Sequence, residues 1–237
     1  MRIFFRNKQA KVLGQFNDYL LLPCNILYAP IPKAANTTIK HLFLNVCNKI
    51  SDTELAHIKQ NPQSIHGIMK RHYGIEKEEF YRLGMSNKCF CFSVLRDPIQ
   101  RFKSFYLDKI LNNGWPREMY GHIYEAYGIL ANQAFKDVVD IACRIPDRLA
   151  DIHFRSQYDI LGGAYSLQCP YRLYDVSEVH KLLNDLAVHG LSLNPSIKIN
   201  NATPSHLTKS IDHDISLYSK LVKRYSFDYS LIATLRD

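Results

Sequence analysis

The chain of 237 residues lacks the features that mark several classes of protein. Its six cysteines form no CxxC pair, so the usual spacing of a structural zinc site is missing. No linker rich in Gly, Ser or Pro and no internal repeat divides the sequence, so we expect a single domain over residues 1–237. Gln15, Asn17 and Asp18 interrupt the apolar N-terminal stretch, which is too short for a transmembrane helix or signal peptide. We therefore expect a cytoplasmic protein with no integral membrane segment.

What the chain does have is an excess of positive charge. Its net charge is +8, and 46% of its residues are hydrophobic, enough to bury a substantial core. The positive charge suits an anionic partner, which could be a nucleotide, an acidic polymer, a nucleic acid or a membrane face. A recognition helix or interspersed aromatic residues would favour nucleic acid, and neither is evident in the sequence. We expect no nucleic-acid partner.

The stretch of residues 25–50 predicts a strand, a tight loop and an amphipathic helix. Residues 25–29 are apolar, and the loop Pro30-Ile31-Pro32-Lys33 follows them. Asn36, Thr37 and Thr38 are expected in the first turn of the helix. Apolar residues then recur at helical spacing on one face, namely Ile39, Leu42, Phe43, Val46, Cys47 and Ile50.

The same order recurs at residues 89–110. CFCFSVL is a nearly continuous apolar run, typical of a strand buried on both faces of a parallel sheet. Asp97 suits the N-cap of the following helix and Pro98 its first position. Two such units predict an α/β fold, with a central parallel sheet flanked by helices.

The remaining sequence predicts three further helices and one strand. The helices are expected at about residues 133–145, 178–189 and 207–225, with Ser177 capping the second and Gly190 ending it. Residues 170–176 read as a strand, and residues 111–130 as an irregular segment.

Both strand-to-helix loops carry groups that bind anions. Ligands of open α/β sheets bind beyond the carboxyl ends of the strands, where helix N-termini offer unpaired N–H groups. In the first loop, Lys33 is a cation, and the N–H groups of residues 34–38 and the hydroxyls of Thr37 and Thr38 can donate to phosphate. In the second, Arg96 follows the strand and Ser104 lies further along the helix. Two separate anion sites indicate a ligand phosphorylated at two places.

The first loop differs from the P-loop of nucleoside triphosphatases, GxxxxGK[ST]. It has the lysine but none of the glycines, and Pro30 and Pro32 restrict its backbone. No strand-end aspartate of the Walker B kind is clear either, because Asp97 is expected to cap a helix. A kinase is therefore disfavoured.

PKAANTTIKHLF resembles the 5′-phosphosulfate loop of sulfotransferases that use 3′-phosphoadenosine 5′-phosphosulfate (PAPS), and SVLRDPIQRFKSFYLDK resembles their 3′-phosphate motif. The sequence is most similar to the carbohydrate sulfotransferases of the chondroitin and dermatan type (sulfotransferase family 2), whose R-D-P-x-x-R-x-x-S-x-Y run is followed by D-K. DIHFRSQYDIL, IKINNATPSHL and the closing pair Tyr225 and Asp228 extend the resemblance more loosely, over about residues 25–229.

The resemblance implies a P-loop-like nucleotide-binding fold and assigns roles to particular residues. The 5′-phosphosulfate would lie against Lys33, Ala34, Ala35, Asn36, Thr37 and Thr38. Arg96 and Ser104 would bind the 3′-phosphate, and Asn200 and Ser205 would belong to a loop over the nucleotide. Adenosine 3′,5′-bisphosphate (PAP) would be the product. Lys33 and the helix N-terminus would stabilise the leaving phosphate, so no metal is required.

The acceptor hydroxyl needs a base, and two histidines are candidates. His66 is the first choice, because related sugar sulfotransferases place a His-Gly pair between the two phosphate motifs. His153 is the second, as the base or as an acceptor-orienting residue with Arg155 and Gln157.

The acceptor itself is left open by the sequence. A sugar hydroxyl of a glycoconjugate is expected, in a groove lined by basic and aromatic residues such as Lys70, Arg71, His72, Arg117, Tyr120, Tyr124 and Tyr127. The animal enzymes of the family carry an N-terminal membrane anchor, which this sequence does not show, so a bacterial member is expected. A tyrosine, lipid or small alcohol is the alternative acceptor, and a non-enzymatic polyanion-binding protein is the alternative function.

Overall fold

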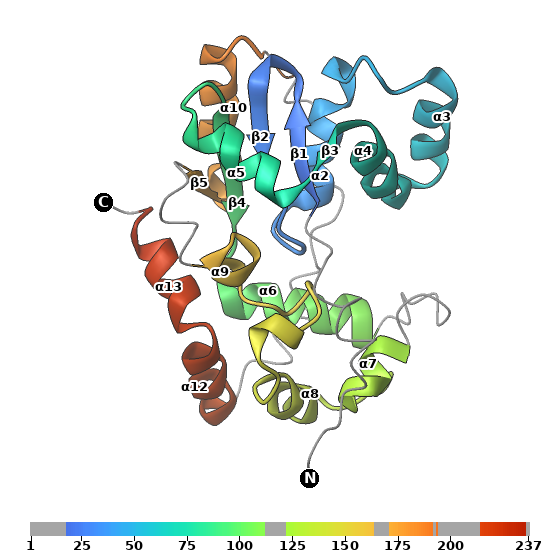
Figure 1. Cartoon of the computed structure of the whole chain (residues 1–237). Coiled ribbons are helices and arrows are strands. Elements are labelled where there is room, and N and C mark those ends of the chain that lie inside the picture. The colour runs from blue at the N-terminus through green and yellow to red at the C-terminus, as the bar shows by residue number, and fades with distance from the viewer. Residues whose placement is uncertain (1–17, 112–121, 164–170, 192, 194–213, 236–237) are drawn as a thin grey trace. The chain divides into compact units, whose positions relative to one another are not determined.

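The structure is a computed structural model that describes residues 18–111, 122–163, 171–191, 193 and 214–235 (Figure 1). The chain divides into two compact units, which we call the sheet unit and the helical unit. The sheet unit comprises Asn17–Leu95 and Leu161–Ala202. The helical unit comprises Met1–Phe16, Arg96–Ile160 and Thr203–Asp237. The single domain expected from the sequence stays a prediction.

The sheet unit contains a five-stranded sheet in the order β3-β1-β2-β4-β5. The strands are β1 (Tyr19–Leu22), β2 (Ile26–Tyr28), β3 (Gly74–Ile75), β4 (Phe90–Leu95) and β5 (Arg172–Asp175). β2 pairs with β4 and β4 with β5 in parallel, which confirms the expected parallel centre. β1 runs antiparallel to both β2 and β3, so the sheet is mixed. The α/β class is confirmed.

Helices cover both faces of this sheet. The helices of the sheet unit are α2 (Asn36–Phe43), α3 (Asp52–Gln60), α4 (Ile65–Tyr73), α5 (Lys77–Met85) and α10 (Val179–Val188). One face packs against α2, α4 and α10, through a core that includes Tyr28, Phe43 and Phe92. Phe80 of α5 packs against Tyr19 at a ring-centroid distance of 4.5 Å on the opposite face. Burial of β2 and β4 between these layers explains why their sequences are almost entirely apolar.

The helical unit is built around α6 (Pro98–Phe105), which directly follows β4 in the chain. Its core joins Phe102 and Phe105 to residues of the neighbouring helices. The other elements are a π-helical segment (Tyr106–Leu111), α7 (His122–Tyr127), α8 (Phe135–Ala142), α9 (Gln157–Ile160), α12 (Ile215–Arg224) and α13 (Ser226–Ala233). In the part of the chain that the structure describes, no helix combines the length and the apolar character needed to cross a bilayer.

The strand-to-helix junctions lie where the sequence predicts them. Several predicted helix boundaries differ from those in the structure. Asp97 caps α6 by accepting a hydrogen bond from the Gln100 N–H at 2.9 Å, as expected. The expected cap Ser177 is wrong, because Asp175 closes a capping box with Glu178 and Ser177 lies inside that turn. Helices α3, α4 and α5 were not anticipated, nor was α13. The expected helix at 207–225 begins at Ile215 in the described part, and residues 207–213 lie outside it.

Candidate functional site

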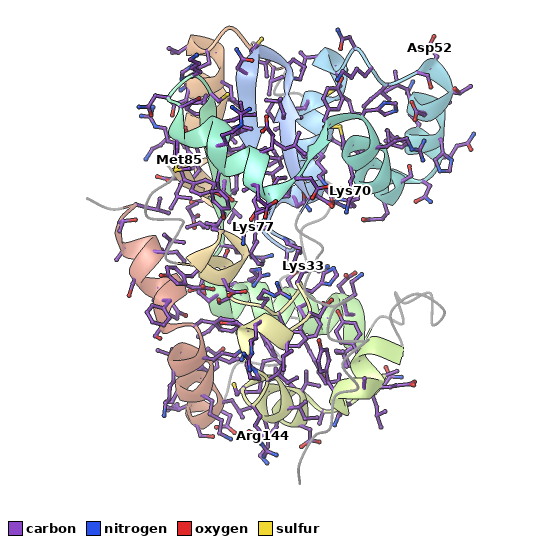
Figure 2. All side chains as sticks on the ribbon, in the orientation of Figure 1. Lys33, Asp52, Lys70, Lys77, Met85 and Arg144 are labelled. Atoms are coloured by element: carbon purple, nitrogen blue, oxygen red, sulfur yellow. The ribbon has the colours of Figure 1, made fainter. Side chains whose placement is uncertain are left out.

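The loop between β2 and α2 has an unusual backbone. Lys33 and Ala35 have φ values of 67° and 56°, in the left-handed region that residues with a Cβ seldom adopt. Such residues cost about 1–3 kcal/mol each and persist where the surrounding structure requires them, often at ligand sites. Backbone that alternates between hands turns neighbouring N–H groups toward a common point and makes a concavity for anions. Lys33 is labelled in Figure 2.

Four N–H groups of this loop remain candidates as anion donors. The expectation for a fifth, that of Ala34, is wrong, since this N–H donates to the Ile31 carbonyl at 3.2 Å and Ala34 is fully buried. The Ile39 N–H donates to the Ala35 carbonyl at 2.9 Å, which starts the helical ladder of α2. The N–H groups of residues 36–38 therefore belong to the first turn, where a helix supplies no backbone partner.

Asn36 adds a second polar feature to the same loop. Its side-chain oxygen is buried, and among the described residues it has no hydrogen-bond partner. This amide oxygen is an acceptor, so a partner for it must be a hydrogen-bond donor. The loop thus carries a buried amide beside its left-handed backbone.

His66 lies at the start of α4 and contacts α2 through both ring nitrogens. Nε2 is 3.1 Å from the Thr37 hydroxyl oxygen, and Nδ1 is 3.2 Å from Lys40 Nζ. Helices α2 and α4 pack against each other in the core of the sheet unit, which brings these side chains together. His66 is therefore adjacent to the expected phosphosulfate loop.

Lys40 is the buried centre of this group. Its side chain is 0% exposed, and Nζ lies 3.5 Å from Asp18 Oδ2. Asp18 also pairs with Lys70, at 3.0 Å through its other oxygen. Burial lowers the pKa of Lys40, and the Asp18 carboxylate opposes that shift. The four residues Asp18, Lys40, His66 and Thr37 form a continuous chain of polar contacts from the start of β1 to the loop.

In the helical unit, the peptide of Arg96 is held on both sides by one side chain. The Arg96 N–H donates to Gln157 Oε1 at 3.0 Å, and Gln157 Nε2 donates to the Arg96 carbonyl at 2.8 Å. Asp228 of α13 accepts hydrogen bonds from the backbone N–H groups of Gln157 and Tyr158 at 3.0 and 2.9 Å. Burial raises the pKa of Asp228, which is 0% exposed, and these N–H groups oppose the shift. Arg96 is therefore fixed at its backbone while its side chain remains partly exposed.

Three further polar residues of the 3′-phosphate motif, Arg101, Lys103 and Ser104, are buried. Ser104, expected to contact the 3′-phosphate, is only 6% exposed. Arg101 is 1% exposed and donates to the carbonyls of Arg155 and Ile152 at 2.6 and 2.7 Å. Arg101 thus ties α6 to the segment that contains His153.

His153 is held by a carboxylate. Its Nδ1 lies 2.7 Å from Asp151 Oδ1, which also accepts hydrogen bonds from the His153 N–H at 3.0 Å and the Tyr124 hydroxyl at 2.6 Å. Burial acts to raise the pKa of Asp151, but His153 and Tyr124 outweigh it and bring the value down to about 2. A carboxylate that accepts from Nδ1 leaves the lone pair of a neutral imidazole on Nε2.

Several residues expected near the acceptor have other roles. Gln157 is committed to Arg96 and Asp228, and Arg155 donates to the Ala150 carbonyl at 2.8 Å, so neither is placed to orient an acceptor. Tyr124 and Tyr127 are buried and cannot line a groove. The exposed cations Lys70 and Arg71 and the half-buried His72 all form ion pairs. Asn200, Ser205, Arg117 and Tyr120 lie outside the described residues.

The sequence analysis missed Asp18, Lys40 and Asp151. Lys40 follows Thr37 by three residues and so shares its helix face, and it stands beside the buried Ile39. Asp151 precedes His153 by two residues, a spacing at which an aspartate readily bonds a nearby backbone N–H. The spacings of Lys40 from Thr37 and of Asp151 from His153 can be read in the sequence. Neither spacing tells whether the contact is buried or exposed.

In open α/β sheets, ligands bind beyond the carboxyl ends of parallel strands, and a helix N-terminus there suits an anion, which is the position of the loop between β2 and α2. The model of the Sulfotransferase family matches residues 23–232, so the chain belongs to that family. It is accordingly a transferase of sulfuryl groups. No curated protein and no solved structure matches the chain.

Proposed function

We propose that the protein transfers the sulfuryl group of PAPS to a hydroxyl of a carbohydrate or glycoconjugate. The observation that carries the proposal is the loop between β2 and α2, where left-handed backbone at Lys33 and Ala35 opens a helix that presents Thr37 and Thr38. Family membership makes sulfuryl transfer the reaction. The net charge of +8 suits a donor with several negative charges.

In the proposed reaction, the acceptor oxygen forms a bond to sulfur while the bond from sulfur to the 5′-phosphate oxygen breaks. The electron pair of the broken bond stays on the phosphate, which leaves as part of PAP. Lys33 and the N–H groups of residues 35–38 would stabilise the charge that develops there. Such a transfer resembles phosphoryl transfer, in which positioning and electrostatic stabilisation provide most of the acceleration. The proposal requires no metal ion.

Arg96 is proposed to bind the 3′-phosphate. The double hydrogen bond from Gln157 holds its peptide, so the guanidinium starts from a fixed point. A guanidinium pairs with phosphate through two parallel hydrogen bonds, which gives direction as well as charge. Ser104 is proposed only as a minor contact, because it is nearly buried.

The carboxylate at Nδ1 of His153 favours this residue as the base. With hydrogen on Nδ1 facing Asp151, neutral His153 has its lone pair on Nε2 and can accept a proton there. Both ring nitrogens of His66 face protein groups, Thr37 on one side and Lys40 on the other. We therefore propose that His153 accepts the proton of the acceptor hydroxyl and that His66 orients the Thr37 hydroxyl.

A direct experiment tests the reaction. The purified protein is incubated with PAPS labelled with ³⁵S and a panel of mono- and oligosaccharides, tyrosine peptides, lipids and small alcohols, and labelled products are identified by mass. A sulfated sugar is the expected result. Sulfation confined to a non-sugar hydroxyl would overturn the acceptor class. Release of the bound protein from heparin by salt but not by micromolar PAP would instead favour a simple polyanion binder.

A further inference from the structure

Lys40, a buried lysine on α2, has no role in the proposed reaction. It nevertheless contacts His66, which contacts Thr37 of the proposed anion site. Lys40 is completely buried, on the same helix as Thr37, and its ammonium lies between a carboxylate and an imidazole. Burial of a charged amine is costly unless it is paired and hydrogen-bonded. A methionine or leucine would fill the same space at no such cost, so the retained charge requires an explanation.

The contacts of Lys40 define the direction of the hydrogen bonds around it. An ammonium group has three hydrogens and no lone pair, so it can only donate. Toward His66 it therefore donates to Nδ1, and the hydrogen of a neutral imidazole must be on Nε2. Nε2–H then donates to the Thr37 oxygen, 3.1 Å away.

This direction determines what the Thr37 hydroxyl can do. A hydroxyl that accepts a hydrogen bond from a histidine keeps its own hydrogen available for another acceptor. Thr37 is in the first turn of α2, whose unpaired N–H groups also favour an anion. The two hydrogen bonds, from Lys40 to His66 and from His66 to Thr37, thus both donate in the direction of the loop.

We propose that Lys40, held by Asp18, is a positioning residue that fixes His66 as its Nε2–H tautomer and so turns the hydroxyl of Thr37 into a donor for the anion in the loop. This proposal rests on the proposed function, because it takes the anion to be the 5′-phosphate end of the nucleotide. Lys40 itself does not touch the ligand. Its effect passes through His66, and the Asp18 carboxylate opposes the effect of burial on the ammonium.

The alternative arrangement is chemically distinct and can be measured. A neutral Lys40 amine could accept from Nδ1–H, in which case Nε2 would accept from Thr37 and the hydroxyl would be lost to the anion. Nitrogen NMR of the full chain labelled with ¹⁵N-histidine separates the two tautomers, because an imidazole nitrogen without hydrogen resonates well downfield of one with hydrogen. The His66 signals are assigned by comparison with His66→Gln.

The expected result for the wild-type protein is hydrogen on Nε2 of His66 and none on Nδ1. Hydrogen on Nδ1 would overturn the proposal, and this measurement needs no ligand. In Lys40→Met, whose side chain has a similar length, the preference for the Nε2–H tautomer should be lost. Lys70→Met is the matched control, since it removes the other lysine on Asp18 and leaves the contact with His66 intact.

Nucleotide affinity provides the second readout. Lys40→Met should bind PAP about tenfold more weakly, the usual value of a hydrogen bond to a charged group, whereas Lys70→Met should stay within about twofold. Thr37→Val should lose at least as much as Lys40→Met. The double variant should lose no more than Thr37→Val alone, because Lys40 acts only through that hydroxyl. Additive losses would show that Lys40 acts by charge or by packing, and would overturn the proposal.

The two proposals fail in different ways. If the wild-type protein does not bind PAP by calorimetry, the proposed function is wrong, and the tautomer of His66 still tests the role of Lys40. If PAP binds and the tautomer is Nδ1–H, the function stands and the positioning role is wrong.

Discussion

The two histidines considered as bases differ in the group that faces Nδ1. His153 faces Asp151, a buried carboxylate at 2.7 Å, and His66 faces Lys40, a buried amine at 3.2 Å. The carboxylate can only accept and the ammonium can only donate, so the two rings carry their hydrogen on opposite nitrogens. The comparison teaches that the role of a histidine depends on whether its buried neighbour is negatively or positively charged. Residue type and motif position do not reveal that sign.

The largest effect is expected from His153→Ala. Loss of a general base should lower kcat by about 10²–10⁴ and leave the Kd for PAP nearly unchanged. His66→Ala should instead weaken PAP binding about tenfold, with a smaller loss of kcat, because Thr37 loses its partner. Steady-state kinetics with calorimetry on both variants separates the two roles. The reverse assignment, with kcat lost only in His66→Ala, would break the comparison.

Lys33→Ala should have the next largest effect. Removing one charge that stabilises a leaving oxygen should lower kcat by about 10²–10³. The exposed Lys59 of α3 provides a control with the same charge change, and Lys59→Ala should retain full turnover. Equal losses in both variants would show that only net charge matters, and would remove Lys33 from the site.

Arg96→Ala should remove the preference for a 3′-phosphate. A charge-assisted hydrogen bond contributes about 1.5–3 kcal/mol, so PAP should bind about 10- to 150-fold more weakly, while adenosine 5′-phosphate should bind as before. The ratio of the two Kd values, measured by calorimetry, reports the effect. An unchanged ratio would withdraw the 3′-phosphate from Arg96.

The Asp151 carboxylate beside His153 should also affect the free energy of unfolding at low pH. The pKa of Asp151 is about 2 in the folded protein, below its usual value of 3.8, so its stabilisation is present above about pH 4 and is lost as the pH falls toward 2. The contribution is about 2 kcal/mol. Urea unfolding at several pH values should show this loss in the wild-type protein and not in Asp151→Asn. Parallel curves would contradict the assignment.

The smallest effect is expected from metal removal. If either histidine were a metal ligand, EDTA would abolish turnover. The proposed roles use both rings as hydrogen-bonding groups, so turnover after dialysis against EDTA should change less than twofold, a difference of about 0.4 kcal/mol. Restoration of a lost activity by Zn²⁺ or Mg²⁺ would contradict both assignments.

The sequence predicted the features that depend on local chemistry. The apolar runs of β2 and β4, the cap Asp97 and the turn that carries Thr37 all follow from spacing and residue type. It did not predict β1 and β3, because strands of four and two residues have too few positions for a period to be recognised. The left-handed backbone at Ala35 was also missed, since alanine gives no sign of it.

The polar contacts were harder to predict than the fold. Asp18 and Lys40 are 22 residues apart, and Gln157 and Asp228 are 71 apart, so only the folded chain brings them together. A lysine in an amphipathic helix ordinarily lies at the solvent boundary, and its complete burial follows from the packing of α2 against α4. The chemistry of both histidines therefore depends on long-range contacts.

The hold of Asp228 on the backbone of residues 157 and 158 has a practical meaning for protein production. A shortened version made for crystallisation must keep α13, because without Asp228 the backbone N–H groups of Gln157 and Tyr158 would lose their acceptor and the clamp on Arg96 would be released. Helix α13, far from either phosphate motif in the sequence, is thus a requirement for a usable preparation.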